Sequence, residues 1–242
     1  MRAVLLVARR EMASLFATPL GVFALVAFLV AQGGLTFTLG GFFARDQADL
    51  AAFFGPLPWV LLPFTAALAM RLWAGERGTG TIELLMALPV APGQAVLGKF
   101  VAAWGFCVLA LALCAPFVVT VNLLGEPDNG AIACGFAGAA LLAAALVALG
   151  EAASACARSQ AVAFLAALCG GGALLACATP MAAEVLSPVP ALSWLAGALS
   201  LLDRFDRLAD GAMALADVAM LGSVAAFWLL VAGLAVRRWP GP

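Results

Sequence analysis

The segment RLWAGERGTGTIELLMALPVAPGQ, residues Arg71–Gln94, interrupts a chain that is otherwise almost continuously apolar. It begins with charged and small residues and continues with apolar side chains at Ile82, Leu85 and Met86, the i, i+3, i+4 spacing of one helix face. Pro89 then disfavours further helix. The segment, called the connector below, therefore predicts a short capped helix between two membrane spans.

The connector also contains turn and capping residues. Gly75, Gly78 and Gly80 predict a sharp chain reversal, because glycine adopts backbone conformations that other residues avoid. Thr79 or Thr81 can cap the helix that follows, and a carboxylate such as Glu83 is favoured in a first turn by the helix dipole. A helix of this size fits a groove on a soluble protein, and packing on its own bundle is an equally open interpretation.

Hydrophobic residues make up 65% of the 242 residues and charged residues only 10%, so the chain is predicted to be an all-α integral membrane protein. A bilayer core of about 30 Å needs roughly 20 apolar residues in a helix. No soluble domain or internal repeat is evident, so residues 1–242 are interpreted as a single transmembrane domain. Six segments are long and apolar enough to span: Leu20–Gly41, Phe54–Ala74, Gln94–Leu124, Ala131–Cys156, Ala161–Leu186 and Val218–Val236.

Charge distribution predicts the orientation of these spans. If the N-terminus is cytoplasmic, nine of the twelve basic residues lie inside, which agrees with the positive-inside rule. Both termini are then cytoplasmic, and the connector lies on the cytoplasmic side. No cleavable signal is apparent, so the first span is expected to stay as an anchor. The three basic residues left outside are Arg45, Arg204 and Arg207.

Two further helices are predicted to lie on the membrane surface. Residues 1–18 place Val4, Leu5, Ala8, Met12, Leu15 and Phe16 on one arc, which fits an interfacial helix or simply a basic flank that orients the first span. Residues 200–210 place Leu201, Leu202, Phe205, Leu208 and Ala209 opposite five charged residues, with Asp203 and Arg207 spaced as an i, i+4 pair. This outer amphipathic helix either covers the bundle mouth or contacts a substrate or partner.

Composition excludes several functions. The chain has no His and no Tyr, which removes the usual general base and the commonest metal ligand, and its net charge of −1 does not favour nucleic-acid binding. The six cysteines lie in apolar runs without a CxxC motif and predict no metal site. The sequence contains no GxxxxGK[ST] phosphate loop. A catalytic role is therefore not expected.

Three stretches resemble the six-span permeases of ABC-2 type ATP-binding-cassette exporters, especially the gliding-motility (GldF-like) and nitrous-oxide-reductase maturation (NosY-like) subunits. The most specific is AGERGTGTIELLMALPVAPGQAVLGKF, residues Ala74–Phe100, which includes a lysine in the third span. The others are ACARSQAVAFLAAL at Ala155–Leu168 and DRFDRLADGAMALADVAML at Asp203–Leu221, followed by the terminal RRW. They occur in the family's order over most of the chain.

This resemblance implies that residues 76–90 form a coupling helix through which a separate cytosolic ATPase drives the membrane subunit. It implies a second permease, either another copy or a related chain, and a bacterial inner membrane. ATP and Mg²⁺ would be bound by the ATPase, with no cofactor on this chain. The positions implied for ATPase contact are Glu76, Arg77, Gly80, Thr81, Glu83 and Leu84.

Polar residues inside the predicted spans are candidates for a substrate path. Glu151 is a carboxylate within the fourth span, where charge is costly, so it marks either a functional site or a side chain that reaches the interface or pairs with Arg158. Gln32 and Asn122 are the other candidates, and hydrogen bonds between helices explain them equally well.

Two alternative functions remain open at this level. A stand-alone secondary transporter or channel is expected to show ionisable residues near the midplane or repeated broken helices, and neither is evident. A membrane scaffold or assembly factor would use the connector for docking without ATP coupling. The predicted function is the permease subunit of an ATP-driven exporter.

Overall fold

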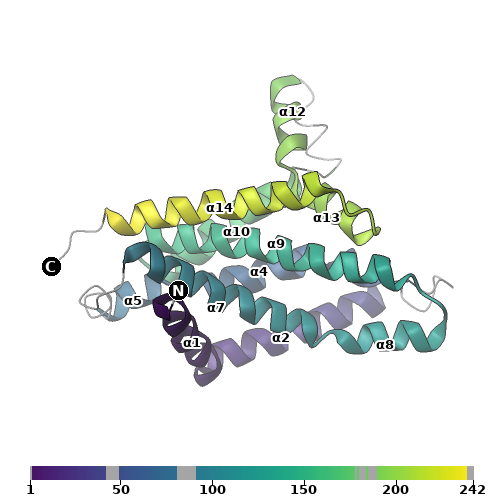
Figure 1. The fold of residues 1–242 in the computed structure, drawn as a ribbon, viewed down its shortest axis with the longest axis horizontal. Helices are drawn as coiled ribbons and strands as arrows, with labels where there is room; N and C mark the ends of the chain where they lie inside the picture. Colours follow the sequence, from purple (N-terminus) through teal and green to yellow (C-terminus); the bar gives the residue numbers. More distant parts are fainter. Residues whose placement is uncertain are drawn as a thin grey trace.

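Long helices run side by side along the longest dimension of the protein (Figure 1). The computed structural model describes residues 2–41, 49–80, 91–177, 179, 184 and 190–238, and every regular element in these ranges is a helix. Five stretches of the described residues are long and apolar enough to cross a bilayer. They are Pro19–Thr38, Ala51–Gly78, Pro92–Leu124, Asn129–Cys156 and Leu215–Arg237.

Prolines divide two of these stretches into shorter helices. The second consists of α3 (Ala51–Phe54), α4 (Leu57–Ala69) and α5 (Ala74–Thr79), with Pro56 between α3 and α4. The third consists of α7 (Pro92–Ala112) and α8 (Ala115–Leu124), with Pro116 in the first turn of α8. Proline lacks the amide hydrogen that continues a helical ladder, so it is tolerated at a helix start and breaks the run before it.

Helix α9 (Asn129–Cys156) is the centre of the bundle, and α4, α7, α10 (Gln160–Ala176), α13 (Leu201–Ala209) and α14 (Leu215–Arg237) all pack on it. Its small residues permit this close approach. A Cβ atom at Gly135 would lie 2.5 Å from the Phe54 ring, and one at Gly138 would lie 2.8 Å from Cβ of Leu208. The Asp128 side chain accepts hydrogen bonds from the amides of Gly130 and Ala131 and so caps the start of α9.

The fifth predicted span, Ala161–Leu186, is helical as α10 over 17 residues. Ser159 caps this helix by accepting a hydrogen bond from the Val162 amide, and α10 packs against α4 and α9. It is shorter than the other spans, and the predicted remainder lies largely outside the described residues. The six-span count therefore stays a prediction.

The N-terminal segment is helical as α1 (Arg2–Ala17), and it ends before Pro19 as predicted. Ala8 and Leu15 of its predicted apolar arc are buried together with Val7, whereas Leu5 and Phe16 of the same arc are exposed. The buried set packs on α7, where a Cβ at Gly98 would lie 2.7 Å from Cβ of Val7. Helix α1 thus has one apolar face for the protein and another that is uncovered, and its position at a membrane surface stays a prediction.

Helix α13 coincides with the predicted outer amphipathic helix, and Leu201, Phe205 and Leu208 are buried as expected. Asp203 attracts Arg207 electrostatically, but the hydrogen bonds of Arg207 go to Asp217: Arg207 Nε donates to Asp217 Oδ2 at 2.9 Å, and Arg204 Nη1 donates to Asp217 Oδ1 at 2.8 Å. Asp217 is nearly inaccessible on α14, where its carboxylate accepts charge-assisted hydrogen bonds from both guanidinium groups. These pairs fasten α13 to α14. Helix α12 (Pro190–Leu199) projects from the bundle near α13 (Figure 1).

The bundle has two ends. The connector end holds α5, the start of α7, the last turn of α9 and the last turn of α14, and the opposite end holds α8 and α13 (Figure 1).

Candidate functional site

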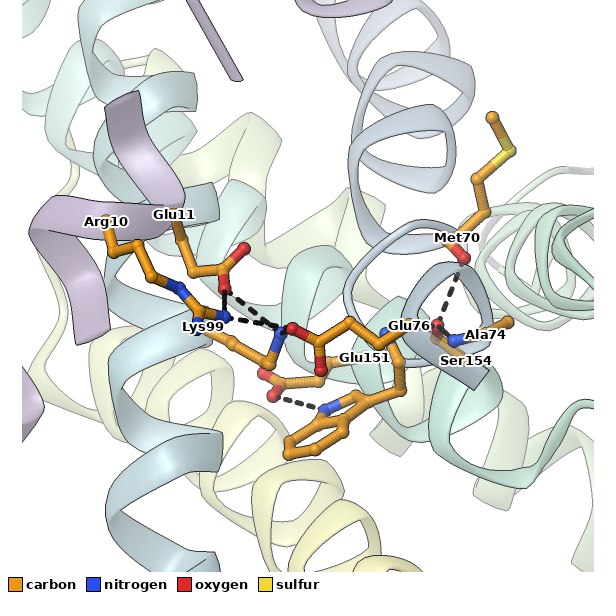
Figure 2. Close-up of polar contacts among 9 residues, drawn as sticks. Arg10, Glu11, Met70, Ala74, Glu76, Lys99, Glu151 and Ser154 are labelled. Atoms are coloured by element: carbon orange, nitrogen blue, oxygen red, sulfur yellow. Dashed lines mark hydrogen bonds and ion pairs between the residues drawn. The ribbon is translucent and has the colours of Figure 1, made fainter. Parts of the chain in front are cut away.

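The candidate site lies at the connector end, where α5 meets α1, α7 and α9 (Figure 2). Helix α5 includes Gly75 and Gly78, so the predicted reversal at these two glycines is wrong. Helix α5 closes at Gly80, whose φ of +72° is a left-handed conformation. Of the predicted coupling segment 76–90, residues 76–80 are described. Thr81, Glu83 and Leu84 lie outside the described residues.

Four charged side chains form an ion-pair cluster at this site, referred to below as the charge cluster: Arg10 and Glu11 from α1, Glu76 from α5 and Lys99 from α7. Lys99 Nζ lies 2.9 Å from Glu76 Oε1 and 3.2 Å from Glu11 Oε1. Arg10 Nη2 lies 2.8 Å from Glu11 Oε1 and 3.0 Å from Glu76 Oε1. The two carboxylates thus each bind both cations.

Because Lys99 is buried, its ammonium group requires these ion pairs. The Lys99 side chain is 0% exposed, and an ammonium ion removed from water is tolerated only when it is paired. Burial raises the pKa of Glu11, but the nearby Lys99 and Arg10 outweigh it, and the pKa of the Glu11 carboxyl is lowered from its ordinary value of 4.5. Glu11 is therefore ionised at neutral pH.

Lys99 also touches an aromatic side chain that binds Glu151. Its Nζ atom lies 4.9 Å from the Trp73 ring centroid, within cation–π range. Trp73 Nε1 donates a 3.0 Å hydrogen bond to Glu151 Oε1, and both side chains are fully buried. Glu151 therefore neither reaches the surface nor pairs with Arg158, which is exposed. Its Oε2 atom has no hydrogen-bond partner among the described residues.

Two further side chains join α5 to the end of α9. Ser154 Oγ accepts hydrogen bonds from the amides of Trp73 (3.1 Å) and Ala74 (3.0 Å) and donates to the Met70 carbonyl (3.2 Å). It therefore satisfies the backbone where α4 gives way to α5. Arg77 Nη1 donates to the carbonyl of Ala157 at 2.8 Å. A cation at this position is favoured by the dipole of α9.

The site brings together Glu76, Arg77 and Glu151, which the sequence selected for separate reasons. Sequence reasoning did not select Arg10, Glu11, Trp73 or Ser154, and it noted Lys99 only as part of a family motif. One signal was available, because Lys99 is the only lysine in the chain and lies within an apolar span.

Gln32 and Asn122 do not join this site. Gln32 is fully buried on α2 (Pro19–Thr38), and its Nε2 donates to the Phe53 carbonyl at 2.7 Å. Asn122 is exposed at the opposite end, where its amide exchanges two 3.0 Å hydrogen bonds with the amide of Asn129. Both residues thus make hydrogen bonds to a neighbouring helix, and a role in a substrate path stays a prediction.

The sequence pattern of the ABC-2 family transporter proteins matches residues 24–191, which is more than half of the chain. The chain belongs to this family, whose members are membrane components of transport systems. No curated protein matches the chain. The resemblance to ABC-2 permeases is confirmed at the level of the family, and together with the apolar helices it identifies a multi-pass membrane protein.

Proposed function

We propose that the chain is the permease subunit of an ATP-driven ABC-2 exporter, in which a separate cytosolic ATPase subunit docks at the connector end. Membership of the ABC-2 family and the lack of a phosphate loop in this sequence support this assignment. ATP and Mg²⁺ then bind to the ATPase. A second permease completes the transporter, which moves a substrate or transmits force across a bacterial inner membrane, with both termini of this chain in the cytoplasm. The gliding-motility-like and NosY-like subgroup is part of the same proposal.

The observation that carries the proposal is the attachment of α5 to three other helices. The charge cluster joins Glu76 to α1 and α7, and Ser154 and Arg77 join α5 to the end of α9. The remaining residues of the connector follow Gly80 in sequence, so a protein that displaces them pulls on all three attachments of α5. A loop that served only to link two spans would not need them.

Burial of Lys99 turns such a displacement into movement of the bundle. Leaving a buried ammonium without a partner costs about 3–5 kcal/mol. When α5 moves, α7 and α1 follow it, or Lys99 gives up Glu76 and keeps Glu11 as its partner. In the first case the force on the connector reaches the third span and the N-terminal helix, and in the second the ion pairs of Glu76 are the first contacts to change.

The proposed ATPase contacts are the connector residues Glu76, Arg77, Gly80, Thr81, Glu83 and Leu84. Because the first two also bind within their own chain, we expect the contact made outside to depend mainly on the residues after Gly80.

The test is co-expression and reconstitution of this chain with a candidate ABC ATPase subunit from the same organism. The complex is purified, and ATP hydrolysis is measured for wild type, Gly80→Pro and Glu83→Arg. Proline cannot adopt the positive φ at Gly80, and Glu83→Arg reverses a connector charge, so both variants should lose co-purification or stimulated turnover. Gly78→Ala is the matched control, since a Cβ there meets no atom within 4 Å.

If Gly80→Pro and Glu83→Arg retain both ATPase binding and turnover, the coupling proposal is wrong. Binding without any effect of this chain on turnover would identify a scaffold instead. Transport by the chain alone would identify a secondary transporter.

A further inference from the structure

An open groove lies between α7 and α14 at the connector end. It has a volume of about 440 Å³ and is lined by apolar side chains and glycines, with Arg237 at one end. Leu97, Leu230 and Leu234 form exposed apolar walls. We propose that this groove binds one anionic phospholipid, with an acyl chain between the helices and the phosphate at the Arg237 guanidinium.

The length of the groove fits one leaflet. Its lining on α14 extends from Ala226 to Arg237, eleven residues apart, which corresponds to about 16 Å of helix at 1.5 Å per residue. The hydrocarbon core of a bilayer is about 30 Å thick, so one leaflet is about 15 Å deep. An acyl chain can therefore lie along the groove while its headgroup stays at the level of the helix end.

The glycines make room for this chain. A Cβ added at Gly93 on α7 or at Gly233 on α14 would meet no atom within 4 Å. Elsewhere in the bundle, as at Gly98 and Gly135, glycine permits direct contact with a neighbouring helix. The two groove glycines instead leave space that no described part of the chain fills.

The positive charge of Arg237 at the end of the groove favours an anionic headgroup. Arg237 is exposed and forms no ion pair with any described residue, and Arg238 follows it at the exposed end of α14. A guanidinium binds phosphate with paired hydrogen bonds. The nine residues that line the groove include no acidic side chain. An anionic phospholipid therefore satisfies both the apolar walls and the charged mouth.

A second copy of the chain fits this groove less well. Around a two-fold axis along the membrane normal, the same patch of each copy meets the other, and the arginines of both copies would gather at the same depth. Like charges at an interface are unfavourable. The lipid site requires only that α7 and α14 span the membrane. Its test therefore does not depend on whether an ATPase binds this chain.

Native mass spectrometry of the full chain in detergent tests the site, with phosphatidylglycerol and phosphatidylcholine of identical acyl chains as probes. Wild type should retain one phosphatidylglycerol per chain and bind it more tightly than phosphatidylcholine. Gly233→Leu fills the groove and should lose both lipids. Arg237→Gln should reduce the preference for phosphatidylglycerol about fivefold, the effect of one cation at a membrane surface.

Two controls separate the site from general lipid contact. Gly34→Leu adds the same bulk at an open glycine of α2, and Arg158→Gln removes another exposed arginine, and neither should change binding. Equal binding of the two lipids by wild type, or an equal loss in Arg158→Gln and Arg237→Gln, overturns the proposal. A change from dimer to monomer in Gly233→Leu, with lipid binding unaltered, overturns it by identifying a protein interface. Arg237→Gln lies at an exposed helix end and keeps the test decisive if Gly233→Leu does not fold.

Discussion

Replacing Lys99 by Met should destabilise the protein more than replacing either of its carboxylate partners. The change keeps an unbranched apolar stem of similar length and removes the ammonium group. Glu76 and Glu11, with side chains only 16% and 15% exposed, then share one cation, Arg10, which is itself half exposed. Both carboxylates lose a charged hydrogen bond and stand close together with the same charge.

The expected cost follows from burial. Breaking a buried ion pair by removing one member costs about 3–5 kcal/mol, and the lower value applies here because Arg10 remains. Glu76→Gln weakens the contacts with Arg10 and Lys99 but keeps an acceptor oxygen and leaves both cations paired with Glu11, so it should cost about 1.5 kcal/mol, the lower end of the range for a charged hydrogen bond. Lys99→Met combined with Glu76→Gln removes one charge of each sign and should be more stable than Lys99→Met alone.

Thermal unfolding of the purified chain in detergent measures these differences. For a chain of this length, 1 kcal/mol corresponds to roughly 2–4 °C in Tm, so Lys99→Met should lower Tm by roughly 6–12 °C and Glu76→Gln by roughly 3–6 °C. Thr38→Val, at an exposed hydroxyl on α2, serves as a control with no expected effect. A Tm for Lys99→Met within 1 °C of wild type, or a larger loss for Glu76→Gln, would refute the assignment of Lys99 as the centre of the cluster.

Three further perturbations have expected outcomes. Ser154→Ala removes three hydrogen bonds between α9 and the α4–α5 junction and should cost about 2 kcal/mol, measured as a loss of Tm against wild type. Gly138→Ala places a Cβ 2.8 Å from Cβ of Leu208 and should cost about 1–3 kcal/mol, and Leu208→Ala in the double variant should recover little of it, because alanine keeps that Cβ atom. Because the folded pKa of Glu11 lies below 4.5, its stabilisation is present above pH 4.5 and is lost as the pH falls through the folded value, so the Tm difference between wild type and Glu11→Gln should be constant above pH 4.5 and shrink progressively as the pH is lowered below it.

Most of the helical architecture could be predicted from the sequence, because length and hydropathy are the properties that a bilayer selects. The positions at which a span is broken into shorter helices were harder to predict. Pro116 marks one, but Pro63 lies inside α4 without ending it, since neighbouring helices compensate for a lost hydrogen bond in a packed bundle. The short α10 was not anticipated, because composition does not record where a helix ends against its neighbours.

The candidate site was only partly predictable for a different reason. Glu76 and Arg77 were selected from a local motif, whereas the residues that bind them are distant in sequence: Glu76 meets Arg10 across 66 positions, and Arg77 meets Ala157 across 80. Local periodicity cannot pair such residues. A buried lysine does indicate that a carboxylate is near, but it does not say which one.

The position of Glu76 distinguishes it from the other members of the charge cluster. Arg10 and Glu11 lie on α1, which is outside the stretch matched to the family, and Lys99 lies on α7 within it. These two helices are in direct contact, since Gly98 leaves no room for a Cβ beside Val7, so α1 and α7 should move as one body. The ion pairs of Glu76 then form a joint between that body and α5. Ion pairs can change partner over a small displacement, whereas close-packed apolar contacts resist it. When the connector is displaced, the ion pairs of Glu76 should therefore change before the contacts between α1 and α7 do.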